Sequence, residues 1–240
     1  MNKKYYIFFL LCFIISCKSN KQIFSKNEYG LIVLTTPKQY FSTVSLDSSK
    51  LLKRLNGFIP NIVFDWRYAT TNNFTKQILY TNPDAYLRIE AANNLKNVAI
   101  ELEKIGLGIK VFDAYRPYSV TKKMWEVVPD DRYASDPAKG SGHNRGIAID
   151  LTLYNLETGT ELEMPTSYDN FTENAHANYQ QLSQIVLKNR TILINTMQMF
   201  GFKVLDTEWW HFYLPNSSKY ELMDYDFKTM SKMCNVNTHK

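Results

Sequence analysis

The stretch SGHNRGIAID, residues 141–150, joins a histidine to an apolar run that ends in an aspartate. Alternate side chains of a β-strand face opposite sides. In such a strand Ile147 and Ile149 lie on one face, whereas Ala148 and Asp150 lie on the other. The first face is typical of a packed core. The second carries a carboxylate beside a small residue, which leaves room above the strand for a group that binds a negative charge.

Glycines surround the histidine of this stretch. Gly140, Gly142 and Gly146 allow the chain to turn tightly and to place the imidazole of His143 beside the face that carries Asp150. A converging histidine and aspartate indicate a metal site, but an ordinary hydrogen bond between them explains the pair equally well. From this stretch alone both interpretations stay open.

A second motif, EWWHF at residues 208–212, favours the metal. His211 would join His143 and Asp150 in a set of three ligands and leave a fourth position open. Three protein ligands with one open position are typical of catalytic zinc sites, whereas structural sites are closed by four ligands. The sequence therefore predicts one Zn²⁺ per chain, in a site that acidifies water and polarises a carbonyl.

Glu208 is the candidate for proton transfer in this site. A carboxylate that does not bind the metal can take a proton from water and pass it to the leaving amine. In a regular strand the side chains of Glu208 and His211 would face opposite ways. The interpretation therefore requires a bend around Trp209 and Trp210.

The segment DAYRP, residues 113–117, contributes an arginine. The proline restricts Arg116 to an extended backbone, which fixes the direction in which its side chain leaves. A guanidinium stays charged and presents a fork of donors, so it suits the negative oxygen of a tetrahedral intermediate. A structural arginine that pairs with Asp113 or with a helix end is the alternative, and spacing alone favours it.

The rest of the chain predicts an α+β fold with a mostly antiparallel sheet and flanking helices. The strands are expected at 61–67, 109–115, 202–205 and 209–214, and helices at 119–128 and within 174–200. A further helix is expected to start at Asn82-Pro83-Asp84, with an apolar stripe of Leu95, Val98, Leu102 and Ile105 before Gly106 ends it.

The N-terminus has the layout of a lipoprotein signal. Two lysines and an apolar run precede Ser16-Cys17, so residues 1–16 are expected to be a signal peptide and Cys17 the lipidated residue. Residues 17–30 are expected to be a polar tether, followed by one domain over 31–240. This predicts an exported, membrane-anchored lipoprotein; an ordinary cleaved signal or a short membrane anchor is the alternative.

Composition limits the remaining partners. With 45% hydrophobic and 21% charged residues, the chain is typical of a well-packed globular protein. The net charge of +5 includes Lys3 and Lys4, and no dense basic block alternates with aromatic residues, so no nucleic-acid partner is expected. After processing, Cys17 and Cys234 would be the only cysteines, and no disulfide within the chain is expected.

Together, SGHNRGIAIDLTLY, EWWHF and DAYRP resemble the vancomycin-resistance type of D-alanyl-D-alanine dipeptidase, within the larger group of zinc D,D-peptidases. The family motifs S-x-H-x-x-G-x-A-x-D and E-x-W-H stand at 141–150 and 208–211. The segments DWRYATTNNF at 65–74 and AYLRIEAANNL at 85–95 extend the resemblance, which covers about residues 58 to 214. It implies the zinc D,D-peptidase fold, which is hedgehog-like.

The resemblance also implies a role for each motif residue. The implied zinc ligands are His143, Asp150 and His211, the implied catalytic residues are Glu208 and Arg116, and the implied substrate-binding residues are Ser141 and Asp169. Ser141 would line the substrate pocket, and Asp169 in SYDNF would hold the free amine of the substrate.

The expected function is hydrolysis of D-alanyl-D-alanine, or of a related D,D-dipeptide from the cell wall, to free amino acids. One alternative is a zinc D,D-carboxypeptidase that acts on longer peptidoglycan stem peptides through the same metal site. An alternative of another class is a zinc-bound lipoprotein that binds without catalysis, although Glu208 and Arg116 speak against it.

Overall fold

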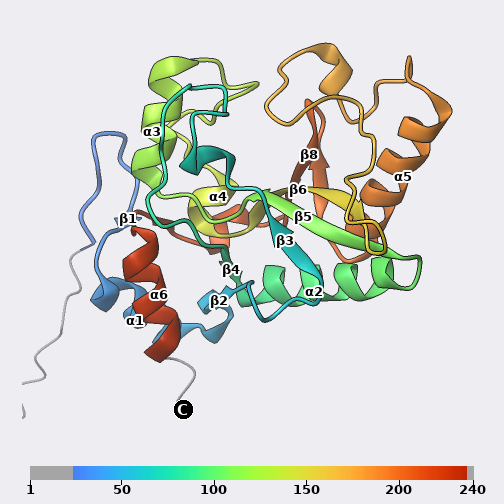
Figure 1. Ribbon diagram of the computed structural model, residues 1–240. Coiled ribbons are helices and arrows are strands. Elements are labelled where there is room, and N and C mark those ends of the chain that lie inside the picture. The colour runs from blue at the N-terminus through green and yellow to red at the C-terminus, as the bar shows by residue number, and fades with distance from the viewer. Residues whose placement is uncertain (1–23, 237–240) are drawn as a thin grey trace, which may run out of the picture.

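A five-stranded sheet runs through the middle of the molecule, with strand order β3-β5-β6-β8-β7 (Figure 1). The computed structural model describes residues 24–236. Within this sheet β3 and β5 are parallel, and the other three pairs of neighbouring strands are antiparallel. The predicted α+β fold with a mostly antiparallel sheet is confirmed. The strands are β3 (Ile62–Phe64), β5 (Leu107–Asp113), β6 (Ala148–Asn155), β7 (Lys203–Leu205) and β8 (Glu208–Tyr213).

Two long helices, α2 (Ile89–Glu103) and α5 (Gln184–Met199), contact each other and pack against the sheet, α2 on β5 and α5 on β7 and β8. Their apolar stripes explain this packing: Leu95 of α2 and Leu193 of α5 are fully buried in the main core. Ile149 of β6 belongs to the same core. As the alternation predicts, one face of β6 meets the apolar core while the face that carries Asp150 does not.

Smaller elements surround the sheet and are visible in Figure 1. Two-stranded pairs join distant parts of the chain: β1 lies parallel to β9, and β2 lies antiparallel to β4. These elements are β1 (Val33–Leu34), α1 (Pro37–Leu46), β2 (Leu52–Arg54), β4 (Tyr86–Arg88), α3 (Tyr118–Val127), α4 (Gly142–Arg145), β9 (Leu222–Met223) and α6 (Phe227–Val236).

The predicted start of helix α2 at Asn82 is wrong. The helix begins at Ile89 rather than at Asn82, because Tyr86–Arg88 pairs with β2 as a strand. Asp84 does not cap a helix; it accepts a hydrogen bond from the Tyr86 hydroxyl at 2.8 Å. The predicted stripe holds except at Ile105, which lies beyond the helix end and is 59% exposed.

The helix within the expected region 174–200 is also shorter than the sequence pattern predicts. Residues 173–175 form one 3₁₀ turn, and α5 begins only at Gln184. Ser183 caps this helix, because its side chain accepts a hydrogen bond from a backbone N–H of the first turn. The intervening loop is tied to the helix by Arg190, whose guanidinium donates to the Tyr179 carbonyl at 2.6 Å. The periodicity of apolar residues does not reveal a contact of this kind between a loop and the following helix.

The first described residues lie against α3. The Asn27 amide donates to the Tyr118 hydroxyl at 3.0 Å, and Glu28 pairs with Lys122 at 2.7 Å. Cys17 and the predicted signal peptide lie outside the described residues. Within residues 24–236, no helix combines the length and the apolar character needed to cross a bilayer.

Candidate active site

His143 lies on α4, a single helical turn that the SGHNRG sequence builds. The Ser141 hydroxyl caps this turn and accepts a hydrogen bond from the His143 backbone N–H at 3.2 Å. Gly146 ends the turn with a φ of 72°, in the left-handed region that glycine adopts without a steric cost. Gly142 allows a close approach, because a Cβ there would lie 2.9 Å from the Ala148 Cβ. The turn therefore rests directly on β6.

Asp150 and His211 come together through sheet register. β6 and β8 are antiparallel neighbours, and Asp150 stands directly opposite His211 in the ladder. On the other side of β6, Asp150 pairs with Asp113 of β5, where the register shifts. Two central strands and the α4 turn thus bring three residues that are far apart in the sequence to one point.

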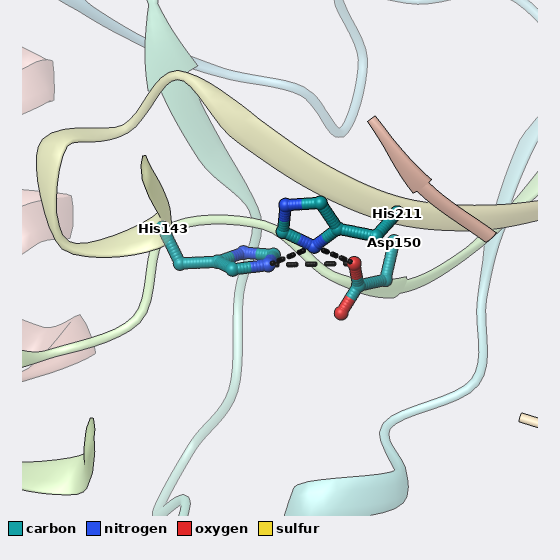
Figure 2. Close-up of side chains that lie close together, drawn as sticks. All are labelled: His143, Asp150 and His211. Carbon is teal, nitrogen blue, oxygen red and sulfur yellow. Dashed lines mark hydrogen bonds and ion pairs between the residues drawn. The ribbon is translucent and has the colours of Figure 1, made fainter. Parts of the chain in front are cut away.

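The side chains of His143, Asp150 and His211 point toward one another (Figure 2). His211 Nδ1 lies 2.9 Å from Asp150 Oδ1 and 3.2 Å from His143 Nε2. His143 Nε2 lies 3.3 Å from Asp150 Oδ1. The structure therefore brings together all three residues that the sequence proposed as ligands.

Neighbouring groups fix which atoms of this cluster face inward. His143 Nδ1 lies 2.7 Å from the Ala114 carbonyl, which can only accept a hydrogen bond, so the proton sits on Nδ1 and the Nε2 lone pair is free. The Tyr168 hydroxyl donates to Asp150 Oδ2 at 2.9 Å and leaves Oδ1 for the cluster. Such outer partners are typical of metal ligands, whose orientation they set.

The donor set fits a zinc ion. Two imidazole nitrogens and one carboxylate oxygen are preferred zinc ligands, and three of them with a side open to a pocket match a catalytic site. The cluster is enclosed, since His143 and Asp150 are 2% and 3% exposed. Burial alone would raise the pKa of Asp150, but the adjoining imidazoles outweigh it and hold the pKa below its usual value. Asp150 is thus anionic and could serve as a metal ligand.

Glu208 faces the cluster because β8 bends. Leu205 of β7 pairs with Glu208 of β8, and Val204 of β7 pairs with Phe212. Three residues of β8 therefore lie between two consecutive pairs and form a bulge. The bend that the sequence interpretation requires is present, and Glu208 Oε2 lies 3.8 Å from His211 Nδ1. Burial, reinforced by the charge of Asp150, raises the pKa of Glu208 well above its ordinary value.

Arg116 combines the two interpretations that its sequence left open. Its Nε and Nη2 atoms lie 2.8 Å and 2.7 Å from Asp113 Oδ2, which is the structural pairing. The same side chain lines the pocket above the cluster, with Nη2 3.9 Å from Asp150 Oδ2. Asp113 is itself held by the Tyr80 hydroxyl at 2.7 Å. The guanidinium is therefore buried, paired and fixed in direction.

A pocket of about 210 Å³ opens beside the cluster and contains Glu208, Arg116, Ser141 and Asp169. This volume suits a ligand of dipeptide size. Ser141 lines the pocket, although its hydroxyl also caps α4. The structure thus gathers every residue that the sequence proposed for catalysis, metal binding and substrate binding around one cavity.

Asp169 lines this pocket. It has a φ of 61°, in the left-handed region where aspartate is enriched. Its carboxylate contacts the Tyr68 hydroxyl at 3.0 Å and accepts from the Phe74 backbone N–H at 3.4 Å. Burial raises the pKa of Asp169 to about 7, although the hydrogen bonds from Tyr68 and Phe74 act in the opposite direction. A cationic amine beside the carboxylate would favour its charged form.

Sequence reasoning missed two tyrosines of the site. Tyr68 and Tyr168 are buried, and their hydroxyls join the carboxylates of Asp150 and Asp169. Tyr68 stands in DWRYATTNNF, which carries part of the family resemblance, and Tyr168 directly precedes Asp169. These two positions are the signals that could have indicated them.

Peptide hydrolysis needs acidified water, a group that moves its proton and a cation for the oxyanion. The cluster could hold a metal ion that acidifies water, and Glu208 and Arg116 in the same pocket could supply the other two functions. The fold and the site thus define a zinc metallopeptidase. Residues 48–232 match the Peptidase_M15 family model, described as D-ala-D-ala dipeptidase. The chain belongs to this family.

Curated relatives agree with the family match. The chain is 34% identical over 164 residues to D-alanyl-D-alanine dipeptidase of Escherichia coli (strain K12), covering 68% of this chain and 84% of the relative. It is 29% identical over 180 residues to D-alanyl-D-alanine dipeptidase of Enterococcus faecalis (strain ATCC 700802 / V583), covering 67% and 89%. These two alignments span most of each relative.

Solved structures resemble the chain more remotely. VanYB in complex with D-alanine-D-alanine has a TM-score of 0.38 at 12% identity, covering 67% of this chain and 88% of that chain. The LD-carboxypeptidase LdcB has a TM-score of 0.39 at 16% identity, covering 77% and 73%. The family assignment rests on sequence and not on these similarities.

Proposed function

We propose that this protein is a zinc-dependent dipeptidase that hydrolyses D-alanyl-D-alanine to free D-alanine. The observation that carries the proposal is the cluster of His143, Asp150 and His211, which opens into a dipeptide-sized pocket beside Glu208. The family of the chain supports the same substrate.

In this proposal His143, Asp150 and His211 hold the zinc ion. When bound, zinc supplies Lewis acidity, which polarises a peptide carbonyl and acidifies water. The three side chains contribute one negative charge in total, so the site keeps a net positive charge. The Ala114 carbonyl and the Tyr168 hydroxyl keep the ligand atoms of His143 and Asp150 aligned before the metal arrives.

Glu208 moves the proton. Its carboxylate is buried beside His211 without being one of the three clustered ligands. The raised pKa makes the carboxylate a stronger base than an exposed glutamate, so it accepts a proton from water more readily. The same oxygen can then return the proton to the amine that leaves when the peptide bond breaks.

Arg116 stabilises negative charge that develops on the carbonyl oxygen. Its guanidinium is fixed by Asp113 and needs no rearrangement at the moment of reaction, which is the condition for electrostatic stabilisation of a transition state. Asp169 and Tyr68 bind the free amine of the dipeptide at the far end of the pocket. Ser141 lines the cavity next to His143.

The direct test is release of D-alanine from D-alanyl-D-alanine by the zinc-loaded protein and by a Glu208→Ala variant. Rapid release by the wild type and at least a hundredfold slower release by the variant are expected. Equal rates for the two proteins would contradict the proposal. A chelator should abolish hydrolysis, whereas a non-catalytic binding lipoprotein would show no hydrolysis to abolish.

Substrate length separates the dipeptidase from a D,D-carboxypeptidase. Both functions use the same cluster, but a carboxypeptidase needs space beyond the amine end of the terminal dipeptide. In the proposed binding mode that end lies at Asp169, and aromatic side chains beside Asp169 also line the pocket. A panel with the free dipeptide and a pentapeptide stem should therefore show a preference for the dipeptide; activity on the stem alone would favour the carboxypeptidase.

The cellular location proposed for the enzyme is the outer side of a membrane, with Cys17 as the lipid anchor. The support is the small residue and cysteine that follow the apolar N-terminal run. An exported enzyme cannot easily deplete a cytoplasmic precursor, so recovery of D-alanine is a better role than antibiotic resistance. Labelling with a fatty acid, which a Cys17→Ser variant should lose, tests this location.

A further inference from the structure

A continuous chain of oxygen atoms connects the metal cluster to the amine end of the pocket. Asp150 Oδ2 lies 2.9 Å from the Tyr168 hydroxyl, which lies 3.0 Å from the Tyr68 hydroxyl. The Tyr68 hydroxyl in turn lies 3.0 Å from Asp169 Oδ1. All three distances are within the range of hydrogen bonds. The two carboxylates at its ends therefore communicate through two phenols.

Aromatic packing holds the Tyr168 ring in place. The ring stacks on Phe112 at 4.5 Å between centroids and meets Trp210 edge-on at 5.5 Å. The side chain is 7% exposed and the ring leaves little freedom to the hydroxyl, which points between Asp150 and Tyr68. Rigid packing of the ring makes the oxygen a fixed support for the metal ligand.

The hydroxyl protons give this chain a direction. The Tyr68 hydroxyl donates to Asp169 Oδ1, and the Tyr168 hydroxyl lies within donating distance of both Asp150 Oδ2 and the Tyr68 oxygen. Because the proton of Tyr68 points to Asp169, the lone pairs of its oxygen are left for Tyr168 and keep that hydroxyl beside Asp150.

We propose that Tyr168 is a positioning residue, which holds Asp150 for the metal and links it through Tyr68 to the amine-binding Asp169. The inference rests on the proposed function for the identity of the metal and the amine. In this arrangement the Tyr168 hydroxyl keeps Asp150 Oδ1 directed at the cluster. Tyr68 accepts from the Tyr168 hydroxyl and helps to hold it in place, without contacting a ligand.

The first experiment measures zinc affinity, by competition with a chromophoric chelator, for the wild type and for Tyr168→Phe. The phenylalanine keeps the stacked ring and removes only the hydroxyl. Loss of an outer partner of a metal ligand should weaken zinc binding about 10- to 100-fold. The matched control is Tyr154→Phe, which removes a buried hydroxyl on the same strand as Asp150, 2.8 Å from the Asn61 carbonyl, and should leave the affinity unchanged.

The second experiment tests the link. Tyr68→Phe should weaken zinc binding at least about twofold, although the Tyr68 hydroxyl contacts no ligand. In the Tyr168→Phe background the same substitution should have no further effect, because the connection is already broken. A purely structural role of either tyrosine predicts that the two effects multiply. Multiplying effects, or an unchanged affinity in Tyr168→Phe, would overturn the proposal.

Activity assays on the same proteins separate this inference from the proposed function. If the wild type binds zinc but releases no D-alanine from D-alanyl-D-alanine, the proposed function is wrong, and the affinities still decide the role of Tyr168. If the wild type is active and Tyr168→Phe retains full zinc affinity, only the inference fails. Circular dichroism of each variant verifies that the fold is intact.

Discussion

Glu208 Oε2 lies 3.8 Å from His211 Nδ1, although the two residues are three positions apart on a strand and would face opposite sides of a regular one. The bulge of β8 against β7 removes that conflict. It allows one short motif to supply both a side chain of the metal cluster and the carboxylate beside it. The chemistry of the site thus depends on an irregularity in the sheet.

Glu208→Gln should separate proton transfer from metal binding. The amide has nearly the same shape but cannot accept a proton, so kcat for D-alanyl-D-alanine should fall by a factor of about 10² to 10⁴. Zinc content, measured by atomic absorption, should stay at one ion per chain. Loss of zinc together with activity would instead show that Glu208 is a ligand.

Arg116→Lys tests the oxyanion role against the structural one. Lysine keeps a positive charge near Asp113, so the buried carboxylate remains partnered and the melting temperature should change little. The fixed fork of donors is lost, and kcat should fall about 10²- to 10³-fold. An unchanged kcat in a stably folded variant would leave Arg116 with the structural role alone.

These residues show which features of the site could be predicted from the sequence. The motif residues carry their chemistry in their type and spacing, so His143, Asp150, His211 and Glu208 could be named before any coordinates. Alternation indicates the face of the strand on which Asp150 lies, whereas the register that places it opposite His211 is seen only in the structure. The bend in β8 could only be stated as a requirement.

Other features depend on tertiary partners that local patterns do not show. Asn82-Pro83-Asp84 has the composition of a helix start, but pairing of the next residues with β2 overrides it. Tyr68 and Tyr168 look like ordinary core tyrosines along the chain. Only the fold brings their hydroxyls, about a hundred positions apart in sequence, to 3.0 Å from each other.

Stability of the metal-free protein should depend on pH through Asp169. Its pKa rises from an ordinary value of 3.8 to about 7 in the folded protein, so the folded state binds the proton more tightly than the unfolded state. This contribution is complete below about pH 4 and is lost as the pH rises through 7, at up to about 1.4 kcal/mol per pH unit. Glu208, whose pKa is also raised, acts in the same direction.

Urea denaturation of the chelator-treated protein between pH 4 and 8 measures this dependence. The free energy of unfolding should fall more steeply with pH in the wild type than in Asp169→Asn, which cannot titrate. Asp206→Asn, at an exposed position, should reproduce the slope of the wild type. The same slope in Asp169→Asn as in the wild type would show that Asp169 is already ionised at low pH.

Aromatic side chains beside Asp169 should limit the length of the substrate. Phe171 stacks with Tyr133 at 4.7 Å between ring centroids and meets Phe74 edge-on at 5.2 Å, and all three line the pocket. Phe74 also donates its backbone N–H to the Asp169 carboxylate. The three rings thus form a wall next to Asp169, where a longer peptide would have to continue if Asp169 binds the amine as proposed.

Phe171→Ala should open this wall. The ratio of kcat/KM for a tripeptide ending in D-alanyl-D-alanine to that for the free dipeptide should rise about tenfold or more, because one pocket contact changes discrimination by about 1–3 kcal/mol. Phe58→Ala, which removes a partly buried ring that does not line the pocket, is the control and should leave the ratio unchanged. An unchanged ratio in Phe171→Ala would show that this ring does not set the length limit.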